Sequence, residues 1–407
     1  MMSHSDTPHD EAPALLTTPS GVERVQAALR ERDLDGWLLY EFRGQNWISA
    51  ELLGTGWTTR RSFVVVPAQG DPVALVHAIE SAAWRHWPWE RRSYAGWKEM
   101  EEALGRLVKG GGRYAVEFSS GAAVPTVDLV PGGALELFRK VGVEPASSGD
   151  LVSMFFSVWT PRQLVEHRTT AEKIAAIARG SFVEAARAIR DGSPHTEGSL
   201  TGWILEAMER DGIVVDPDTH VAVDAGAADP HYAPDGEGEV IGAGRVLLVD
   251  LWGRPHERAV FADQTWMGFM GATPPDEVVR VWEIVRDARD AGVALLEARA
   301  EAGTTIRGYE VDACCRAHIA EAGHGDHFIH RTGHSMDRKL HGSGPNLDDL
   351  ETRDERVLVP GVGFSIEPGV YLAGDFGVRS EINVHFGEDG PEVTPGEIQQ
   401  DLFTFEV

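Results

Sequence analysis

Short apolar runs alternate with helical patterns over the first 150 residues. Residues 21–33 place apolar side chains at intervals of three to four, which predicts an amphipathic helix. The apolar segments at 36–40 and 113–118 are short and contain aromatic and β-branched residues, which is typical of strands. Helices and strands that alternate in this way predict an α/β fold for this part of the chain.

The pattern changes near Thr160, where longer helical stretches begin. Thr196 and Thr273 suit helix N-caps, and glycines follow the predicted helix ends. We expect four helices, at residues 162–190, 196–211, 273–302 and 307–322. Strand-like segments lie between and after them, at residues 219–224, 245–252, 258–268, 362–371 and 377–386. This mixture predicts a second domain of the α+β type.

The change of pattern places a domain boundary at about residues 155–160. A chain of 407 residues is long enough for two domains with separate cores. The N-terminal sequence MMSHSDTPHDEA is polar and acidic. We therefore expect a flexible tail at residues 1–18, an α/β domain at 19–157 and a larger domain at 158–407.

Charge and composition narrow the classes of partner. The formal net charge is −27, whereas nucleic acids and anionic membranes attract basic surfaces. No apolar run reaches the roughly 18 residues of a membrane span, and no secretion signal is evident. The two cysteines, Cys314 and Cys315, are adjacent and form no disulfide framework. We expect a cytoplasmic protein that binds neither nucleic acid nor membranes.

Four acidic residues lie inside apolar strand segments, where a lone charge is costly to bury. Asp250 and Asp263 are 13 residues apart, in RVLLVDLWG and AVFADQTWMGF. Glu367 and Glu381 are 14 residues apart, in GFSIEPGVYL and GVRSEINVHF. Each pair predicts a β-hairpin, in which facing residues lie about 5 Å apart. We expect each hairpin to place its two carboxylates side by side on one face.

Four carboxylates in one place repel one another unless they bind cations or protons. His334, which ends the segment HRTGH, supplies an imidazole. Such a set can hold two divalent ions, with two of the carboxylates bridging them. Oxygen ligands with one nitrogen favour Mn²⁺, Co²⁺, Fe²⁺ or Zn²⁺ over the metals of thiolate sites.

The same segments resemble the M24B pita-bread metallopeptidases, of the Xaa-Pro dipeptidase (prolidase) and aminopeptidase P type. The matching stretches are LLVDLWG, FADQTW, HRTGHSMDRKLHG, FSIEPGVY and GVRSEINV. The N-terminal half is similar, more loosely, to the creatinase-type domain of these enzymes. The resemblance implies a pita-bread α+β catalytic domain preceded by a creatinase-like α/β domain, and a homodimer.

The resemblance also implies a role for each of the five metal ligands. Asp250 would bind one ion, Asp263 and Glu381 would bridge both, and His334 and Glu367 would complete the second. A hydroxide between the ions would attack the peptide carbonyl, while Glu367 takes and returns a proton. The resemblance implies two divalent ions per chain, with Mn²⁺ expected first and Co²⁺ or Zn²⁺ as alternatives.

Three further residues match positions that contact the substrate in the family. His231 in DPHYAP and His341 in KLHG would stabilise the tetrahedral intermediate or the leaving nitrogen. Arg379 lies two residues before Glu381, so both side chains point to the same face of a strand. The arginine would either clamp the carboxylate of a dipeptide or hold a ligand carboxylate in a salt bridge.

The resemblance leaves the substrate open between two peptidase types. An Xaa-Pro dipeptidase requires a free carboxylate on its substrate, which Arg379, Arg331 and Arg338 would favour. A small aminopeptidase P would cleave longer Xaa-Pro-Yaa peptides. A non-catalytic pita-bread binding module and a metal-free, creatinase-like hydrolase are further alternatives, but such relatives lack the full ligand set.

Two features of the sequence concern specificity rather than the ligands. Arg331 stands where the family usually has glycine, and GSGPNLDDLET follows His341 in place of the common motif. In the N-terminal domain, Trp57, Arg60, Arg61 and His77 would reach the site of a neighbouring subunit or serve packing at the surface.

Overall fold

The computed structural model describes residues 13–108, 110–214 and 219–407. It divides into two compact units, Met1–Phe156 and Ser157–Val407. Residues 1–12 of the expected tail lie outside the described residues. The tail prediction is wrong for its last part, because Leu15–Thr17 form a short 3-10 helix, η1, and Leu16 is fully buried. Burial of this side chain in the core anchors the segment before the first α-helix.

The first unit is an α/β domain built on a six-stranded sheet with the order β4-β3-β2-β1-β5-β6. Its strands are β1 (Gly36–Glu41), β2 (Ser62–Pro67), β3 (Val73–His77), β4 (Glu90–Tyr94), β5 (Gly112–Val116) and β6 (Val143–Ser147). Its helices are α1 (Pro19–Glu31), α2 (Trp47–Leu53), α3 (Trp97–Leu107), α4 (Gly132–Lys140) and α5 (Gly149–Phe155), with 3-10 turns η2 (Ala78–Glu80), η3 (Ser120–Ala122) and η4 (Pro125–Val127). The α/β prediction for this half is confirmed.

Both faces of this sheet are buried. Along β1, Trp37 and Leu39 belong to one hydrophobic core, whereas Leu38 and Tyr40 belong to another. Successive strand residues point to opposite faces of the sheet. Burial of both faces therefore explains why the run at 36–40 is apolar at every position.

The second unit is the α+β domain. Its helices are α6 (Pro161–Arg190), α7 (Glu197–Arg210), α8 (Asp276–Glu301) and α9 (Gly308–Glu321), with the 3-10 turn η5 (Gly325–His327). One four-stranded sheet contains β7 (His220–Val223), β8 (Val246–Gly253), β9 (Ala262–Phe269) and β16 (Phe403–Thr404). A second contains β10 (Ser335–Met336), β11 (Val362–Ile366), β14 (Ile382–Gly387) and β15 (Gly390–Thr394), and β12 (Gly369–Leu372) pairs with β13 (Phe376–Arg379).

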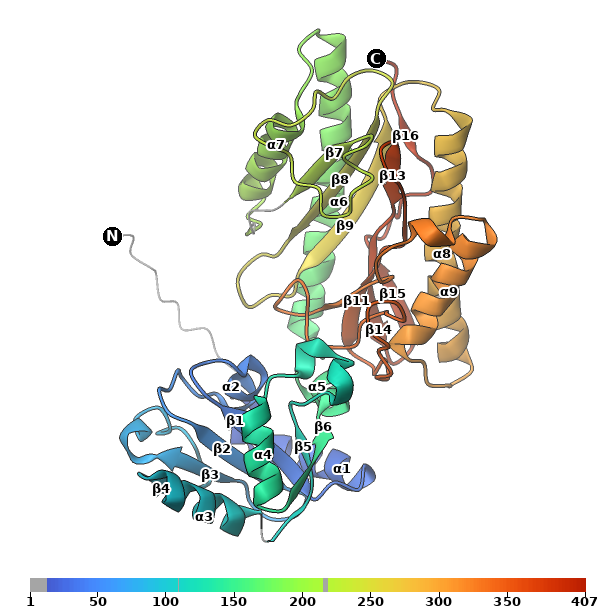
Figure 1. The fold of residues 1–407 in the computed structure, drawn as a ribbon. Helices are drawn as coiled ribbons and strands as arrows, with labels where there is room; N and C mark the ends of the chain where they lie inside the picture. The colour runs from blue at the N-terminus through green and yellow to red at the C-terminus, as the bar shows by residue number, and fades with distance from the viewer. Residues whose placement is uncertain (1–12, 109, 215–218) are drawn as a thin grey trace, which may run out of the picture. The chain divides into compact units, whose positions relative to one another are not determined.

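The two helix pairs of this unit cover the strands from opposite sides (Figure 1). The core beneath α6 and α7 includes Phe182, Ile204 and Trp266. The core beneath α8 and α9 includes Val285 and Phe364. The strands that carry the acidic residues therefore lie between two apolar layers, which holds them rigidly.

The starts of α6 and α7 follow capping signals of the sequence. The cap predicted at Thr273 is wrong, because α8 begins at Asp276 after Pro275, without a side-chain cap hydrogen bond. The Thr160 side chain accepts a hydrogen bond from the backbone N–H of Gln163, and Pro161 occupies the first turn of α6. Thr196 caps α7 in the same way, by accepting a hydrogen bond from the backbone N–H of Ser199.

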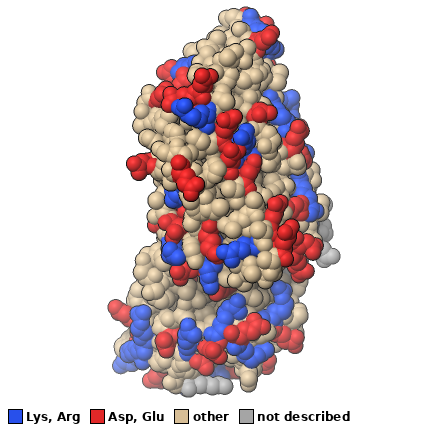
Figure 2. Space-filling model, turned by 90° about the vertical axis from the view of Figure 1, so that its right-hand side faces the viewer, with Lys and Arg blue, Asp and Glu red and all other residues tan. Residues whose placement is uncertain are grey.

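Among the described residues, no helix is both long and apolar enough to cross a membrane. Figure 2 shows acidic and basic side chains interspersed on one face of the molecule.

We expect Phe182→Ala to destabilise the second unit by about 3–5 kcal/mol, the usual cost of emptying a buried phenylalanine site. Phe182 is fully buried, its ring lies 5.3 Å from that of Phe403, and a Cβ at Gly268 would lie only 2.6 Å from it. The neighbouring Val183 is 57% exposed on the same helix, so Val183→Ala should shift stability by roughly 0.5 kcal/mol or less. Urea unfolding would measure both, and equal shifts would contradict this packing.

Candidate metal centre

The β8–β9 hairpin carries the first pair of acidic residues. Its register pairs Asp250 with Thr265 and Trp252 with Asp263, so both carboxylates leave the same face of the sheet. They are diagonal neighbours, typically about 7–8 Å apart, and do not face each other directly as the spacing suggested. Pairing of the two strands resumes at Ala262, after Ala259, Val260 and Phe261, which are buried.

The second hairpin is interrupted at both glutamates. Each of the two strands predicted there is divided in two, because the β11–β14 ladder ends at the pair Ile366–Ile382 and the β12–β13 ladder starts beyond it. Glu367 and Glu381 lie in the gap between these ladders. Their backbone groups are therefore available to other segments.

The freed backbone groups tie the glutamates to the remaining parts of the site. The Glu367 N–H donates to the carbonyl oxygen of Thr332 over 2.7 Å, beside the HRTGH segment. The Glu381 N–H donates to the carbonyl oxygen of Thr265 on β9 over 3.3 Å. The interruption thus joins three segments that are far apart in the sequence.

Uncharged side chains fix the carboxylates between β9 and β14. Asn383 accepts from the Asp263 backbone N–H over 2.9 Å and donates to the Asp263 carbonyl over 2.6 Å. The Thr265 hydroxyl donates to Oε2 of Glu381 over 2.8 Å. These bonds orient the acids without neutralising their charge.

Ser365 performs the same task on the other side. Its hydroxyl oxygen accepts from the His334 backbone N–H over 3.0 Å, and the hydroxyl donates to Oε1 of Glu367 over 3.0 Å. The His334 ring places Nδ1 3.2 Å from the Ser335 carbonyl, where an N–H can donate. That tautomer leaves Nε2 with its lone pair toward the carboxylates, as a metal ligand requires.

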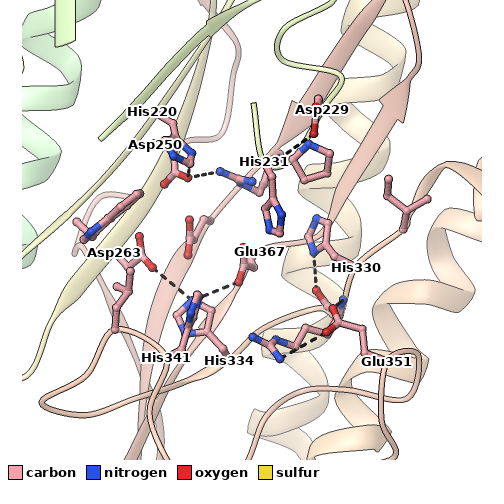
Figure 3. A pocket seen from close by; sticks show the side chains of 17 residues that line it. His220, Asp229, His231, Asp250, Asp263, His330, His334, His341, Glu351 and Glu367 are labelled. Atoms are coloured by element: carbon pink, nitrogen blue, oxygen red, sulfur yellow. Dashed lines mark hydrogen bonds and ion pairs between the residues drawn. The ribbon is translucent and has the colours of Figure 1, made fainter. Parts of the chain in front are cut away.

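Asp263, His334 and Glu381 form a compact buried group, in which one potential ligand atom of each lies within 4.8 Å of the others. His334 Nε2 lies 3.4 Å from Oδ2 of Asp263 and 3.5 Å from Oε1 of Glu367 (Figure 3). Asp250 lies next to this group on the neighbouring strand, and lines the same pocket. The structure therefore brings together all five predicted ligands.

Three carboxylate oxygens at this site are buried without a hydrogen-bond partner in the described structure, namely Oδ1 of Asp250, Oδ1 of Asp263 and Oε1 of Glu381. A buried acceptor with no partner is costly, and a buried unpaired carboxylate is more so. Burial raises the pKa of Asp250, that of Asp263 to about 6, and that of Glu381 well above its usual range, and neighbouring carboxylates add to each rise. This donor set fits divalent cations, which would satisfy the free oxygens and the excess charge.

Glu367 behaves differently from the other acids. Burial alone would raise its pKa, but His334, His330 and Arg379 act against burial and the net result is a lowered pKa. Glu367 is therefore the most readily ionised carboxylate of the group.

Arg379 is engaged by the site itself. Its Nη2 donates to Oδ2 of Asp250 and its Nε donates to the Thr265 hydroxyl over 2.9 Å. The side chain is only 7% exposed. Of the two roles that the sequence left open, the structure supports the salt bridge that holds a ligand carboxylate.

A pocket of about 750 Å³ opens beside the acidic group. Its lining comprises His220, Asp229, Pro230, His231, Asp250, Trp252, Asp263, Ile329, His330, Arg331, His334, Leu340, His341, Glu351, Glu367, Arg379 and Glu381. His231 and His341 both lie at this pocket, from separate loops (Figure 3). Burial lowers the pKa of His341 to about 4, so its ring is neutral near pH 7.

Several pocket residues were missed by the sequence analysis. His220 faces Asp250 across the β7–β8 pair, with Nδ1 4.0 Å from its carboxylate. Asp229 accepts a hydrogen bond from the backbone N–H of His231 over 3.0 Å, and Glu351 lies 3.7 Å from the guanidinium of Arg331. Asp229 could have been found from its place in the DPHYAP motif. His220 could be placed in the pocket only from the pairing register of β7 and β8.

We expect Glu381→Gln to remove metal binding while stabilising the metal-free protein. The substitution relieves repulsion in a group that is crowded without cations, yet it removes a proposed bridging ligand. Added Mn²⁺ should raise the melting temperature of the parent protein clearly and that of the variant little. Calorimetry and elemental analysis would measure this. Glu351→Gln, on the exposed side of the pocket, should behave like the parent, and an unchanged Mn²⁺ response in Glu381→Gln would contradict the assignment.

Asp263 should make the metal-free protein less stable as pH rises from about 4 to about 6. The Asp263 pKa is 3.8 in its unperturbed state and about 6 in the folded state, so the folded protein holds a proton that the unfolded chain releases. Melting curves in a chelator would show the slope. Asp263→Asn should flatten it, and a rise in stability over this range that Asp263→Asn leaves unaltered would contradict the burial of this acid.

The chain is similar to known metallopeptidases. The profile of metallopeptidase family M24 matches residues 170–388, a range that contains all five predicted ligands. The probable dipeptidase PepE of Mycobacterium tuberculosis is 26% identical over 344 residues, which cover 81% of this chain and 82% of that protein. The Xaa-Pro dipeptidase of Lactobacillus helveticus is 33% identical over 196 residues, 48% of this chain and 49% of that protein.

The fold of the whole chain also has a match among solved structures. The crystal structure of dipeptidase PepE from Mycobacterium ulcerans superposes with a TM-score of 0.74 at 23% identity, covering 98% of this chain and 100% of that one. This likeness confirms the predicted architecture of an N-terminal α/β domain and a C-terminal pita-bread domain. With the match over residues 170–388, more than half of its length, the chain belongs to metallopeptidase family M24 and is a metallopeptidase hydrolase.

Proposed function

We propose that the chain is an Xaa-Pro dipeptidase that uses two divalent ions, with Mn²⁺ expected first and Co²⁺ or Zn²⁺ as alternatives. The observation that carries the proposal is the set of partnerless carboxylate oxygens facing one pocket. The proposed ligands are Asp250, Asp263, His334, Glu367 and Glu381. When bound, the ions would supply polarisation of the peptide carbonyl and a water of lowered pKa.

The remaining groups of the pocket provide proton transfer and hydrogen bonding. The pKa of Glu367 is lowered by His334, His330 and Arg379, and Ser365 holds its Oε1, so Glu367 is suited to take a proton and return it to the leaving nitrogen. His341 is neutral and edge-on to His334 at 4.4 Å, so its ring can donate a hydrogen bond without adding charge. With His231 it would stabilise negative charge that develops on the carbonyl oxygen.

The contents of the pocket favour a substrate with a free carboxylate. Arg379 is occupied by Asp250, so we assign it to holding that ligand. Arg331 lines the pocket, and its guanidinium lies 3.7 Å from the Glu351 carboxylate, which is longer than a hydrogen bond. A guanidinium in that state can bind a substrate carboxylate in a bidentate manner. A pocket of about 750 Å³ is also of the size that small-molecule ligands occupy.

The relatives support the choice of reaction class. The names dipeptidase PepE and Xaa-Pro dipeptidase belong to proteins that share 26% and 33% of the aligned residues with this chain. We further propose a cytoplasmic homodimer that acts on proline-containing dipeptides or short peptides.

With Mn²⁺ present, we expect hydrolysis of Xaa-Pro dipeptides and weaker hydrolysis of Xaa-Pro-Yaa tripeptides and of Xaa-Pro amides. Arg331→Gln should raise KM for the dipeptide by about 10- to 100-fold, the value of a charged hydrogen bond, and change that for the amide little. Chromatographic assay of the products would measure each rate.

Each other outcome of this assay identifies an alternative. Faster cleavage of the tripeptides would indicate a small aminopeptidase P. A protein that binds two ions and cleaves none of these substrates would be a binding module. Arg331→Lys serves as the matched variant, because it keeps the charge but loses the bidentate geometry.

A further inference from the structure

One wall of the pocket is a loop rather than a strand. The connection from β7 to β8 covers residues 224–245, and its part at residues 224–240 is the loop in question. Asp229, Pro230 and His231 of this loop line the pocket (Figure 3). Loops of this length need fixed contacts if they are to hold a side chain in a defined place.

One buried carboxylate holds this loop in place. Glu197, the first residue of α7, is fully buried and accepts three hydrogen bonds. The donors are the Val223 backbone N–H over 2.9 Å, the Tyr232 hydroxyl over 2.8 Å and the Glu239 backbone N–H over 2.9 Å. A single side chain thus binds the residue before the loop, its middle and its end.

Further contacts reinforce this arrangement. The Glu197 backbone N–H donates to the Glu239 carbonyl over 3.0 Å, and the Thr196 hydroxyl donates to the Glu237 carboxylate over 2.7 Å. The negative charge of Glu197 also lies at the N-terminus of α7, where the helix dipole favours it. These bonds, called the Glu197 clamp below, satisfy the buried carboxylate with three neutral donors.

Glycines make room for the clamp. Gly238 has φ +66°, and a Cβ there would lie 2.2 Å from Oε2 of Glu197. On the other side of the loop, a Cβ at Gly377 of β13 would lie 1.9 Å from the carbonyl oxygen of Ala227. The loop is therefore held closely between α7 and the strand that carries Arg379.

We propose that Glu197 is a positioning residue that acts on catalysis through His231, and this inference rests on the proposed function of that histidine. Tyr232, which follows His231 directly, transmits the restraint. Glu197 is absent from the residues that line the pocket in the described structure, so it acts without touching substrate. A shift of about 1 Å in a catalytic group can cost about 100-fold in rate.

Glu197→Gln tests the clamp because all three of its partners are donors. A glutamine offers one acceptor oxygen and turns an NH₂ group toward the other donors. We expect kcat on an Xaa-Pro dipeptide to fall by about 10- to 100-fold, with a smaller change in KM and unchanged metal content. Hydrogen exchange should quicken in peptides from residues 224–240 and stay unchanged in those from 362–387.

A double-mutant cycle with His231→Ala separates positioning from general stability. If Glu197 acts through His231, adding Glu197→Gln to His231→Ala should lower kcat by less than about threefold. Glu209→Gln, an exposed glutamate on the same helix, serves as control and should match the parent. Tyr232→Phe removes only the central bond, so it provides a milder variant if Glu197→Gln folds poorly.

The outcomes distinguish the inference from the function on which it rests. Unchanged exchange in residues 224–240 would overturn the clamp, whatever His231 does. Faster exchange with the same loss of kcat in both backgrounds would overturn the action through His231. If His231→Ala keeps full activity, the proposed role of that histidine is wrong, and a loss of kcat in Glu197→Gln would then show that Glu197 acts by another route.

Discussion

The repulsion among buried carboxylates is the constraint on which the structure of the second domain depends. Asp250, Asp263 and Glu381 each keep one oxygen without a partner, and burial and their neighbours raise the pKa of all three. Protons can relieve such crowding only in part. Divalent cations relieve it fully, and they bring with them the chemistry of a metallopeptidase.

The surrounding polar residues hold these carboxylates close together without neutralising their negative charge. Asn383, Thr265 and Ser365 use neutral donors and acceptors to orient the acids. Arg379 is the exception among these residues, since it pairs with Asp250 and offsets part of the negative charge. The site therefore retains enough negative charge to attract cations and enough order to receive them in one geometry.

Much of this fold could be predicted from local sequence. Thr160, Pro161 and Thr196 set helix starts through bonds to residues only a few positions away, which is why those boundaries were readable. The division of the last hairpin was not readable, because the Glu381 N–H is diverted to Thr265, a contact over more than one hundred residues. The partner of Arg379 and the place of His220 depend on the same kind of distant register. Near the N-terminus, the burial of Leu16 could not be predicted either, because it depends on contacts with the core and not on the polar residues next to it in the sequence.

The interrupted ladders at Glu367 and Glu381 have a consequence for the order of events during synthesis. Asp250 and Asp263 are synthesised close together on the β8–β9 hairpin, whereas Glu367, which follows β11, and Glu381, which precedes β14, are synthesised much later. Until then the nascent chain exposes unpaired strand edges and an incomplete set of ligands. The full set of proposed ligands is therefore complete only after nearly the whole domain has been translated, and bound ions would then stabilise a fold that is already assembled.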